Sequence, residues 1–428
     1  MLHQCFLNSG GCRFRTDTLN DSSIRKNYSR YALGILFAVN LLNYIDRQVL
    51  YAVFPLIKED LLLSDTSLGL LGSAFMLCYM VSAPLLGWLG DRTSRVKLAS
   101  YGLAVWSFAT AVSGVAPGYR SLLSARTAVG IGEASFGTVS PGLISDFFPR
   151  EKRGRVLSYF YLAIPVGSAL GYLLGGVLGK AFGWHAAFLI VGVPGLVLVL
   201  PLLFLREPSR GCMQENEIGA PRKTLRDDIK MFMNRSFVIN TLSMASMTFA
   251  LGGLAQWVPT FLYRVHGMDL AAGNTLFGGV TIFAGITGTL TGGMLGDLFQ
   301  KKSGKGYPLV SGWGFLIGTP IAVFALVTPS LPGCITAILL AEFFLFLNTG
   351  PLNTIIVNVT QPGARATAFA VNIFFIHALG DAISPTLLGR LSDMWGLRSA
   401  LLVTPFAILL AAFFSFLCMR SIEKDSVN

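Results

Sequence analysis

The chain has 428 residues, of which 53% are hydrophobic and only 13% are charged. A soluble domain usually carries about 25% charged residues, so this composition excludes a soluble enzyme, a disordered chain and a coiled coil. The net charge of +11 would suggest nucleic acid in a soluble protein. In a membrane protein basic residues report topology instead, and we expect no nucleic-acid partner. The cysteines are scattered without C-x-x-C spacing, so we expect neither a disulfide framework nor a zinc site.

Residues 1–30 contain no apolar run of signal-peptide length, and we expect them to form a cytoplasmic tail. Twelve apolar stretches follow, each long enough to cross the hydrocarbon core, which takes about 20 helical residues. The predicted spans cover about 31–57, 66–90, 97–117, 119–148, 156–180, 184–205, 236–263, 271–296, 308–328, 333–359, 366–389 and 396–419.

The distribution of basic residues predicts the orientation of these spans. With both termini inside, 25 of the 33 Lys and Arg residues fall in the tails and inner loops, and only 6 fall in the outer loops. Cytoplasmic loops carry such an excess of Lys and Arg. We therefore expect an integral protein of the plasma (inner) membrane with both termini in the cytoplasm.

The longest connection, 206–235, divides the spans into bundles at 31–205 and 236–420, followed by a cytoplasmic tail at 421–428. Within this connection Leu225, Ile229 and Phe232 recur at helical spacing among charged residues. That pattern predicts a short amphipathic helix on the cytoplasmic membrane surface. The fold predicted is all-helical, with twelve transmembrane helices in two pseudo-symmetric six-helix bundles.

A short string repeats in the two halves and supports this division. Gly87–Arg95 follows the second span, and Gly293–Asp297 follows the eighth. Two similar halves in one orientation are related by an axis along the membrane normal. Similar strings at Gly142–Asp146 and Gly389–Asp393 are interpreted as coincidence, since the second of them falls on the outer side.

The first string resembles the loop pattern G-x-L-x-D-R-x-x-R-[RK] of the major facilitator superfamily, with Val96 and then Lys97 at its end. An aspartate at a helix end can, with nearby cations, lock two helices in one conformation and release them in another. The alternative is a simple anchor of inward positive charge, and both interpretations remain open. We expect a conformational gating loop that contains Gly87, Asp91, Arg92, Arg95 and Asp297.

Ionisable residues inside a membrane are functional candidates, because each costs at least ~2.5–3.5 kcal/mol to insert. Seven such residues fall inside the predicted spans: Asp46, Arg47, Arg126, Glu133, Glu342, His377 and Asp381.

The first four of these predict a charge network between the first and fourth spans. Asp46 and Arg47 are neighbours and point about 100° apart on a helix, so each needs its own partner. Arg126 and Glu133 share a helix face about 10 Å apart, which suggests the crossed pairs Asp46–Arg126 and Arg47–Glu133. The network is either a permanent clamp or a proton-coupling site that opens when a carboxylate is protonated.

The second half carries a different set of charges. Glu342 has no basic residue near it, so we expect it to be protonated or bonded to amides such as Asn348 or Asn353. His377 and Asp381 are four residues apart and are able to hydrogen-bond directly, either as a functional pair or as a helix contact. No second His or Cys lies at metal-ligand spacing, so we expect no metal.

Several longer strings resemble the Spinster family of lipid transporters over about residues 31–420. They are Asn43–Arg47, Arg126–Ser135, Phe160–Ser168, Trp257–Pro259 and His377–Pro385. The resemblance implies transport of lysophospholipids or sphingoid lipids, with protons as a possible coupling ion. It places Asp46, Arg47, Arg126 and Glu133 at the central charged positions. It gives Glu342, His377, Asp381, Trp257 and Phe136 as substrate-binding candidates.

Other functions remain as alternatives at this stage. A small organic anion held by Arg47 and Arg126 is one, and a passive flippase without gradient coupling is another. An acyl transferase using His377 and Asp381 would need a nucleophile and oxyanion donors that we cannot locate. No G-x-x-x-x-G-K-[ST] string occurs. We therefore expect a monomeric secondary transporter among membrane lipids, with no enzymatic activity and no cofactor.

Overall fold

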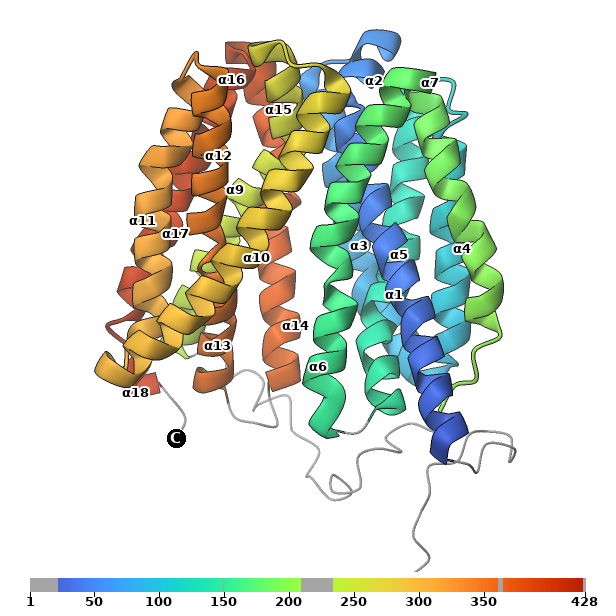
Figure 1. Cartoon of the computed structure of the whole chain (residues 1–428), viewed down its shortest axis with the longest axis horizontal. Coiled ribbons are helices and arrows are strands. Elements are labelled where there is room, and N and C mark those ends of the chain that lie inside the picture. Colours follow the sequence, from blue (N-terminus) through green and yellow to red (C-terminus); the bar gives the residue numbers. More distant parts are fainter. Residues whose placement is uncertain (1–21, 149, 209–233, 361–364, 426–428) are drawn as a thin grey trace, which may run out of the picture.

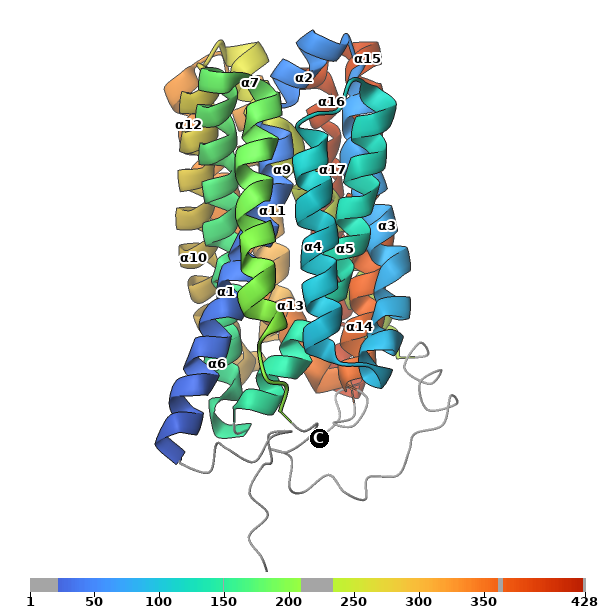
Figure 2. The ribbon, with the colours of Figure 1, turned by 90° about the vertical axis from the view of Figure 1, so that its right-hand side faces the viewer.

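The structure is a computed structural model that describes residues 22–148, 150–208, 234–360 and 365–425. The helices lie roughly along one common axis and form two groups that lie side by side (Figures 1 and 2). We call residues 22–208 the N half and residues 234–425 the C half. We call the end where Ser22 and Asp425 lie the proximal end, and the opposite end, near α2 and α16, the distal end (Figure 1).

The helices of the N half are α1 (Ser22–Ala52), α2 (Phe54–Leu61), α3 (Asp65–Arg92), α4 (Arg95–Ser113), α5 (Tyr119–Phe147), α6 (Arg150–Tyr161) and α7 (Ala163–Leu203). Those of the C half are α9 (Arg235–His266), α10 (Leu270–Ser303), α11 (Gly306–Val327), α12 (Leu331–Phe346), α13 (Thr349–Val359), α14 (Arg365–Ile376), the π-helical turn η2 (His377–Asp381), α15 (Ser384–Trp395), α16 (Leu397–Leu401), α17 (Val403–Cys418) and α18 (Ile422–Asp425).

Short polar side chains begin several of the membrane helices. Ser64, Ser94, Asn234, Asp269 and Ser330 are N-caps, and each accepts a hydrogen bond from a backbone N–H in the first turn. The first four N–H groups of a helix have no partner within it, so such caps fix where a helix starts. The polar residues between apolar stretches therefore set the boundaries of the spans.

The all-helical membrane fold predicted from the sequence is confirmed, and the helices agree with twelve crossings. Eight helices of the described chain are long and apolar enough to span a membrane. One of these long helices contains two predicted spans, because α7 turns at Gly183, where φ is 82°. Glycine adopts this positive φ without the steric cost of a side chain. Other predicted spans consist of shorter helices in series, as in α12 with α13 and α16 with α17.

Two features differ from the expectation or lie beyond the structure. Helix α1 begins at Ser22 rather than at residue 31, so part of the expected tail is helical. The predicted amphipathic helix at Leu225–Phe232 lies outside the described residues.

The packing of the two halves repeats: α3 packs on α5 as α10 packs on α12, and α4 packs on α7 as α11 packs on α17.

The two halves meet at the distal end. Hydrogen bonds and ion pairs between described residues of the two halves join α3 to α9 and α15, α7 to α9 and α10, and α1 to α10. The ring of Phe54 also packs on Trp257, with centroids 5.5 Å apart. These contacts between described residues close the two halves on each other at the distal end.

Candidate functional site

A buried ion pair joins α1 to α5. Arg47 Nε donates to Glu133 Oε2 at 2.7 Å, and the side chains are 16% and 0% exposed. The Arg47 guanidinium also lies 5.0–5.2 Å from the ring centroids of Tyr44, Phe75 and Tyr79. Aromatic faces attract cations, so this cage offers Arg47 favourable contacts besides Glu133. The predicted Arg47–Glu133 contact is present.

The predicted Asp46–Arg126 ion pair is not formed. Asp46 Oδ2 instead accepts a hydrogen bond from Thr110 Oγ1 of α4 at 3.2 Å. The cause is helical geometry: once Arg47 faces Glu133 on α5, the neighbouring Asp46 is turned about 100° away. The predicted pairs required both Asp46 and Arg47 to contact α5, and in the structure only Arg47 does so.

Arg126 is therefore a buried cation with spare hydrogen-bond donors. It is 1% exposed, and its Nε and Nη1 atoms have no hydrogen-bond partner among the described residues. Its guanidinium lies 5.7 Å from the ring of Phe75 and 5.9 Å from that of Phe188. Phe75 thus lies near both arginines. A buried donor without a partner costs free energy, and an anionic group that reached Arg126 would remove that cost.

Glu342 lies in α12 and is 9% exposed. Its Oε1 accepts a hydrogen bond from Thr281 of α10 at 3.2 Å, whereas Oε2 has no partner among the described residues. The proposed amide partners are not used, because Asn348 and Asn353 donate to backbone carbonyls of their own segment. The hydrogen-bond partner of Glu342 therefore comes from the neighbouring helix α10 and not, as we expected, from an amide of its own segment.

His377 and Asp381 lie together in the π-helical turn η2. The Nδ1 atom of His377 is 2.8 Å from Asp381 Oδ1, and the side chains are 26% and 18% exposed. The turn is closely packed, since a Cβ atom added to Gly252 of α9 would lie 2.3 Å from the Cβ of Asp381. π-helical turns within helices often occur at functional sites. The expected direct bond between these two side chains is present.

The two aromatic candidates are buried in the packing of the helices. Trp257 is 0% exposed, and its Nε1 donates to the Pro385 carbonyl at 3.1 Å. Phe136 is 1% exposed, and its ring lies between those of Trp106 and Phe160. In this conformation neither ring presents a surface that a substrate could touch.

The predicted gating loop is part of a larger proximal cluster. Arg95 binds Asp91 at 3.5 Å and Asp146 of α5 at 2.8 Å. Glu207 accepts hydrogen bonds from Ser94 Oγ and from the Arg95 backbone N–H, so its carboxylate helps to cap the N-terminus of α4. Asp146 ends the string Gly142–Asp146, which we interpreted as coincidence, and its pairing with Arg95 gives that string a structural role. No motif in the sequence pointed to Glu207.

The equivalent aspartate of the C half behaves differently. Asp297 accepts a hydrogen bond from the Tyr307 hydroxyl at 2.9 Å, within its own half. Arg92 lies over the ring of Trp88, with 4.1 Å between the guanidinium carbon and the ring centroid. The structure thus brings Asp91 and Arg95 together, and places Asp297 and Arg92 in separate local contacts.

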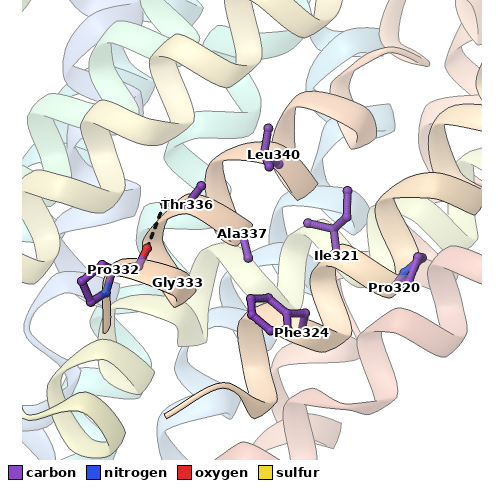
Figure 3. A pocket seen from close by; sticks show the side chains of 8 residues that line it. All are labelled: Pro320, Ile321, Phe324, Pro332, Gly333, Thr336, Ala337 and Leu340. Atoms are coloured by element: carbon purple, nitrogen blue, oxygen red, sulfur yellow. Dashed lines mark hydrogen bonds between the residues drawn. The ribbon is translucent and has the colours of Figure 1, made fainter. Parts of the chain in front are cut away.

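A groove of about 580 Å³ lies between α11 and α12, and none of its lining residues is charged (Figure 3). It is lined by Pro320, Ile321, Phe324, Pro332, Gly333, Thr336, Ala337 and Leu340. The Thr336 hydroxyl donates to the Pro332 carbonyl and is satisfied within its helix. None of the candidate residues lies in this groove, and we assign no substrate to it. The described residues contain no group of three His, Cys, Asp or Glu placed to hold a metal ion.

The chain has two similar helical halves that are closed on each other at one end, and it buries charged side chains. This arrangement is typical of a class of membrane transporters. The family model of the Major Facilitator Superfamily matches residues 36–385. The chain is 35% identical to protein spinster homolog 1 of Xenopus tropicalis, over 91% of this chain and 80% of the relative. It is 36% identical to the sphingosine-1-phosphate transporter SPNS2 of Danio rerio, over 90% of this chain and 82% of the relative.

A solved structure agrees with these sequence relatives. The crystal structure of a bacterial homolog of the human lysosomal transporter Spinster, inward-facing and unoccupied, superposes with a TM-score of 0.86 at 25% identity, over 94% of this chain and 99% of that one. The chain therefore belongs to the Major Facilitator Superfamily and, within it, to the Spinster family. It is an integral membrane transporter and not an enzyme.

Proposed function

We propose that this transporter moves a lysophospholipid or a sphingoid-type lipid by alternating access, with protons coupled through Glu133. The observation that carries the proposal is the buried Arg47–Glu133 contact together with a nearby Arg126 whose Nε and Nη1 donors have no partner among the described residues. Arg126 would hold a phosphate, for which guanidinium geometry is well suited. The relative SPNS2 is described as a sphingosine-1-phosphate transporter, which supports this class of substrate.

The acidic residues of the C half complement the arginines of the N half. Glu342 Oε2 has no partner in the described part of the chain, and Asp381 with His377 is partly exposed. A zwitterionic head group would place its phosphate toward Arg126 and its ammonium toward one of these carboxylates. Because the two sets of charges belong to different halves, such a substrate would bridge the surfaces that move in alternating access.

Protonation of Glu133 would change the contacts of Arg47. The ion pair forms only while Glu133 is ionised, and burying both charges is favourable only while they remain paired. When a proton neutralises Glu133, Arg47 loses its anionic partner and keeps only its aromatic contacts. A substrate phosphate would then be the strongest available partner for a buried arginine, which couples proton binding to substrate binding.

The proposed orientation follows from the distribution of charge. In the described chain, the proximal helix ends carry more Lys and Arg, among them Arg92, Arg95, Lys301 and Lys302, than the distal helix ends do, which supports a cytoplasmic location for the proximal end. The distal closure would then make the conformation inward-facing, as its bacterial relative is described. We further propose a monomer in the plasma (inner) membrane, surrounded by membrane lipids.

A small organic anion is the second candidate, since Arg47 and Arg126 would bind a carboxylate as readily as a lipid phosphate. The two proposals separate in one uptake experiment with purified protein in proteoliposomes. Uptake of a labelled lysophospholipid, inhibited by sphingosine-1-phosphate and not by short carboxylates, is the expected result. Uptake of a short carboxylate without lysophospholipid transport would overturn the lipid assignment.

A further inference from the structure

Two stripes of residues face each other across the distal contact between the halves. On α3 the residues Asp65, Gly69 and Ser73 are spaced by four and share one helix face. On α15 the residues Pro385, Gly389 and Asp393 are spaced in the same way. The stripes run antiparallel, so that Asp393 meets the first turn of α3 and Thr386 bonds Ser73 at 2.7 Å.

The glycines in these stripes allow the backbones to touch. A Cβ atom added to Gly69 would lie 2.3 Å from the carbonyl oxygen of Pro385. A Cβ atom added to Gly389 would lie 2.3 Å from the carbonyl oxygen of Asp65. The obstructing atoms are backbone, which cannot rotate away as a side chain would. The closed distal contact therefore requires glycine at both positions.

Asp393 binds the N-terminus of a helix that belongs to the other half. Its Oδ1 accepts from the Asp65 backbone N–H at 2.7 Å, and its Oδ2 accepts from the Thr66 N–H at 2.8 Å and from the Thr66 hydroxyl at 2.6 Å. These N–H groups have no partner within α3, and a carboxylate there also meets the positive end of the helix dipole. The bonds exist only while the two halves are closed.

The carboxylate of Asp65 completes the contact from the N half. It accepts from Arg264 of α9 at 2.9 Å and from Ser392 of α15 at 2.6 Å, both in the C half. It also pairs with Lys58 of its own half at 2.5 Å. Its side chain is only 4% exposed. When the halves separate, Asp65 would keep its ion pair with Lys58, and water would replace Arg264 and Ser392 as hydrogen-bond donors. The Asp65 carboxylate would therefore have partners in both conformations.

We propose that Asp65 and Asp393 form a distal latch, which holds the distal ends of the two halves closed and is released during the transport cycle. The latch concerns the transport cycle itself and does not depend on which substrate is carried. It also revises the interpretation of the string Gly389–Asp393: Gly389 permits the close approach of α15 to α3, and Asp393 forms the bonds across it.

The latch predicts that Asp393 variants open the distal end. Spin labels at Arg120 and Pro329, exposed distal positions of the N and C halves, would report the opening by electron paramagnetic resonance in full-length protein whose native cysteines are replaced. Asp393→Ala removes the three bonds to Asp65 and Thr66. We expect the ratio of distal-open to distal-closed protein to rise at least about tenfold.

Two further variants make this result specific. Thr66→Val removes one bond to Asp393 and keeps the backbone, so we expect a smaller shift in the same direction. Asp269→Asn is the matched control: it weakens the exposed Lys180–Asp269 pair across the same gate but retains a good helix cap. We expect that control to change the ratio less than about twofold.

Thermal unfolding of each variant shows that the protein is folded. If folded Asp393→Ala protein keeps the wild-type distance distribution, the latch is refuted. Equal shifts in all three variants would also overturn it, because any change of a polar side chain at the gate would then suffice. A shift in Asp393→Ala and Thr66→Val, without one in Asp269→Asn, supports the latch.

Discussion

Arg47 and Glu133 lie 86 positions apart in the chain, and their side chains meet at 2.7 Å inside the N half. Asp46 and Arg126 do not complete a second pair, which leaves Arg126 buried, with Nε and Nη1 bonded to no other residue that the structure describes. A fully matched network of four charges would act as a static clamp. The unmatched arrangement instead offers a place for an anionic group, and the predictions below follow from it.

Removal of the Arg126 charge should impair transport while the Arg47–Glu133 pair remains. We expect Arg126→Ala to lower lysophospholipid uptake by at least about tenfold, since a charge-assisted hydrogen bond contributes roughly 1.5–3 kcal/mol. Arg120→Ala, an exposed arginine at the start of the same helix, is the control and should retain uptake. Wild-type uptake by folded Arg126→Ala protein would remove Arg126 from the substrate site.

A methyl group at Gly69 should disfavour the distal-closed conformation. In Gly69→Ala the new Cβ atom would meet the Pro385 carbonyl, and overpacking of this kind costs roughly 1–3 kcal/mol. We expect a cysteine-specific reagent to modify an engineered cysteine at Ser73 faster in this variant. Gly279→Ala of α10 is the control, because the space around its Cβ position is open. In that variant the cysteine at position 73 should be modified at the wild-type rate. Equal rates in the two variants would contradict close packing at Gly69.

Trp257 should contribute to stability rather than to substrate affinity. The Trp257→Phe variant loses the hydrogen bond to the Pro385 carbonyl, and a hydrogen bond of this kind contributes roughly 0.5–1.5 kcal/mol. We therefore expect a lower unfolding temperature and an unchanged KM for the lipid. A raised KM with wild-type stability would instead restore Trp257 as a substrate contact.

The sequence predicts the positions of the membrane helices because each needs a long apolar run bounded by polar residues, and both properties are local. The pair His377–Asp381 was predictable for the same reason, since its members lie one helical turn apart. The partners of Asp46 and Glu342 were not, because Thr110 and Thr281 come from other helices and leave no pattern in the chain. Asp393 was dismissed because its string falls on the outer side. Its bonds to Asp65 and Thr66 span more than 320 positions and leave no pattern in the chain.

The central claim is that Glu133 couples protons to transport, and the direct test compares Glu133→Gln with wild type in proteoliposomes. The variant keeps a hydrogen-bonding side chain of similar shape but cannot take up a proton. Asp269→Asn is the control. The pKa of Asp269 lies below its ordinary value because Lys180 and the Ala272 backbone N–H donate hydrogen bonds to it. That carboxylate therefore stays ionised throughout the pH range of the measurement.

The measurement is uptake of labelled lysophospholipid with and without an imposed pH gradient, between pH 5 and 7.5. We expect the gradient to stimulate uptake by wild type and by Asp269→Asn. We expect no stimulation in Glu133→Gln, with lipid binding largely retained. Stimulation of Glu133→Gln to the wild-type level would contradict the assignment of Glu133 as the coupling residue.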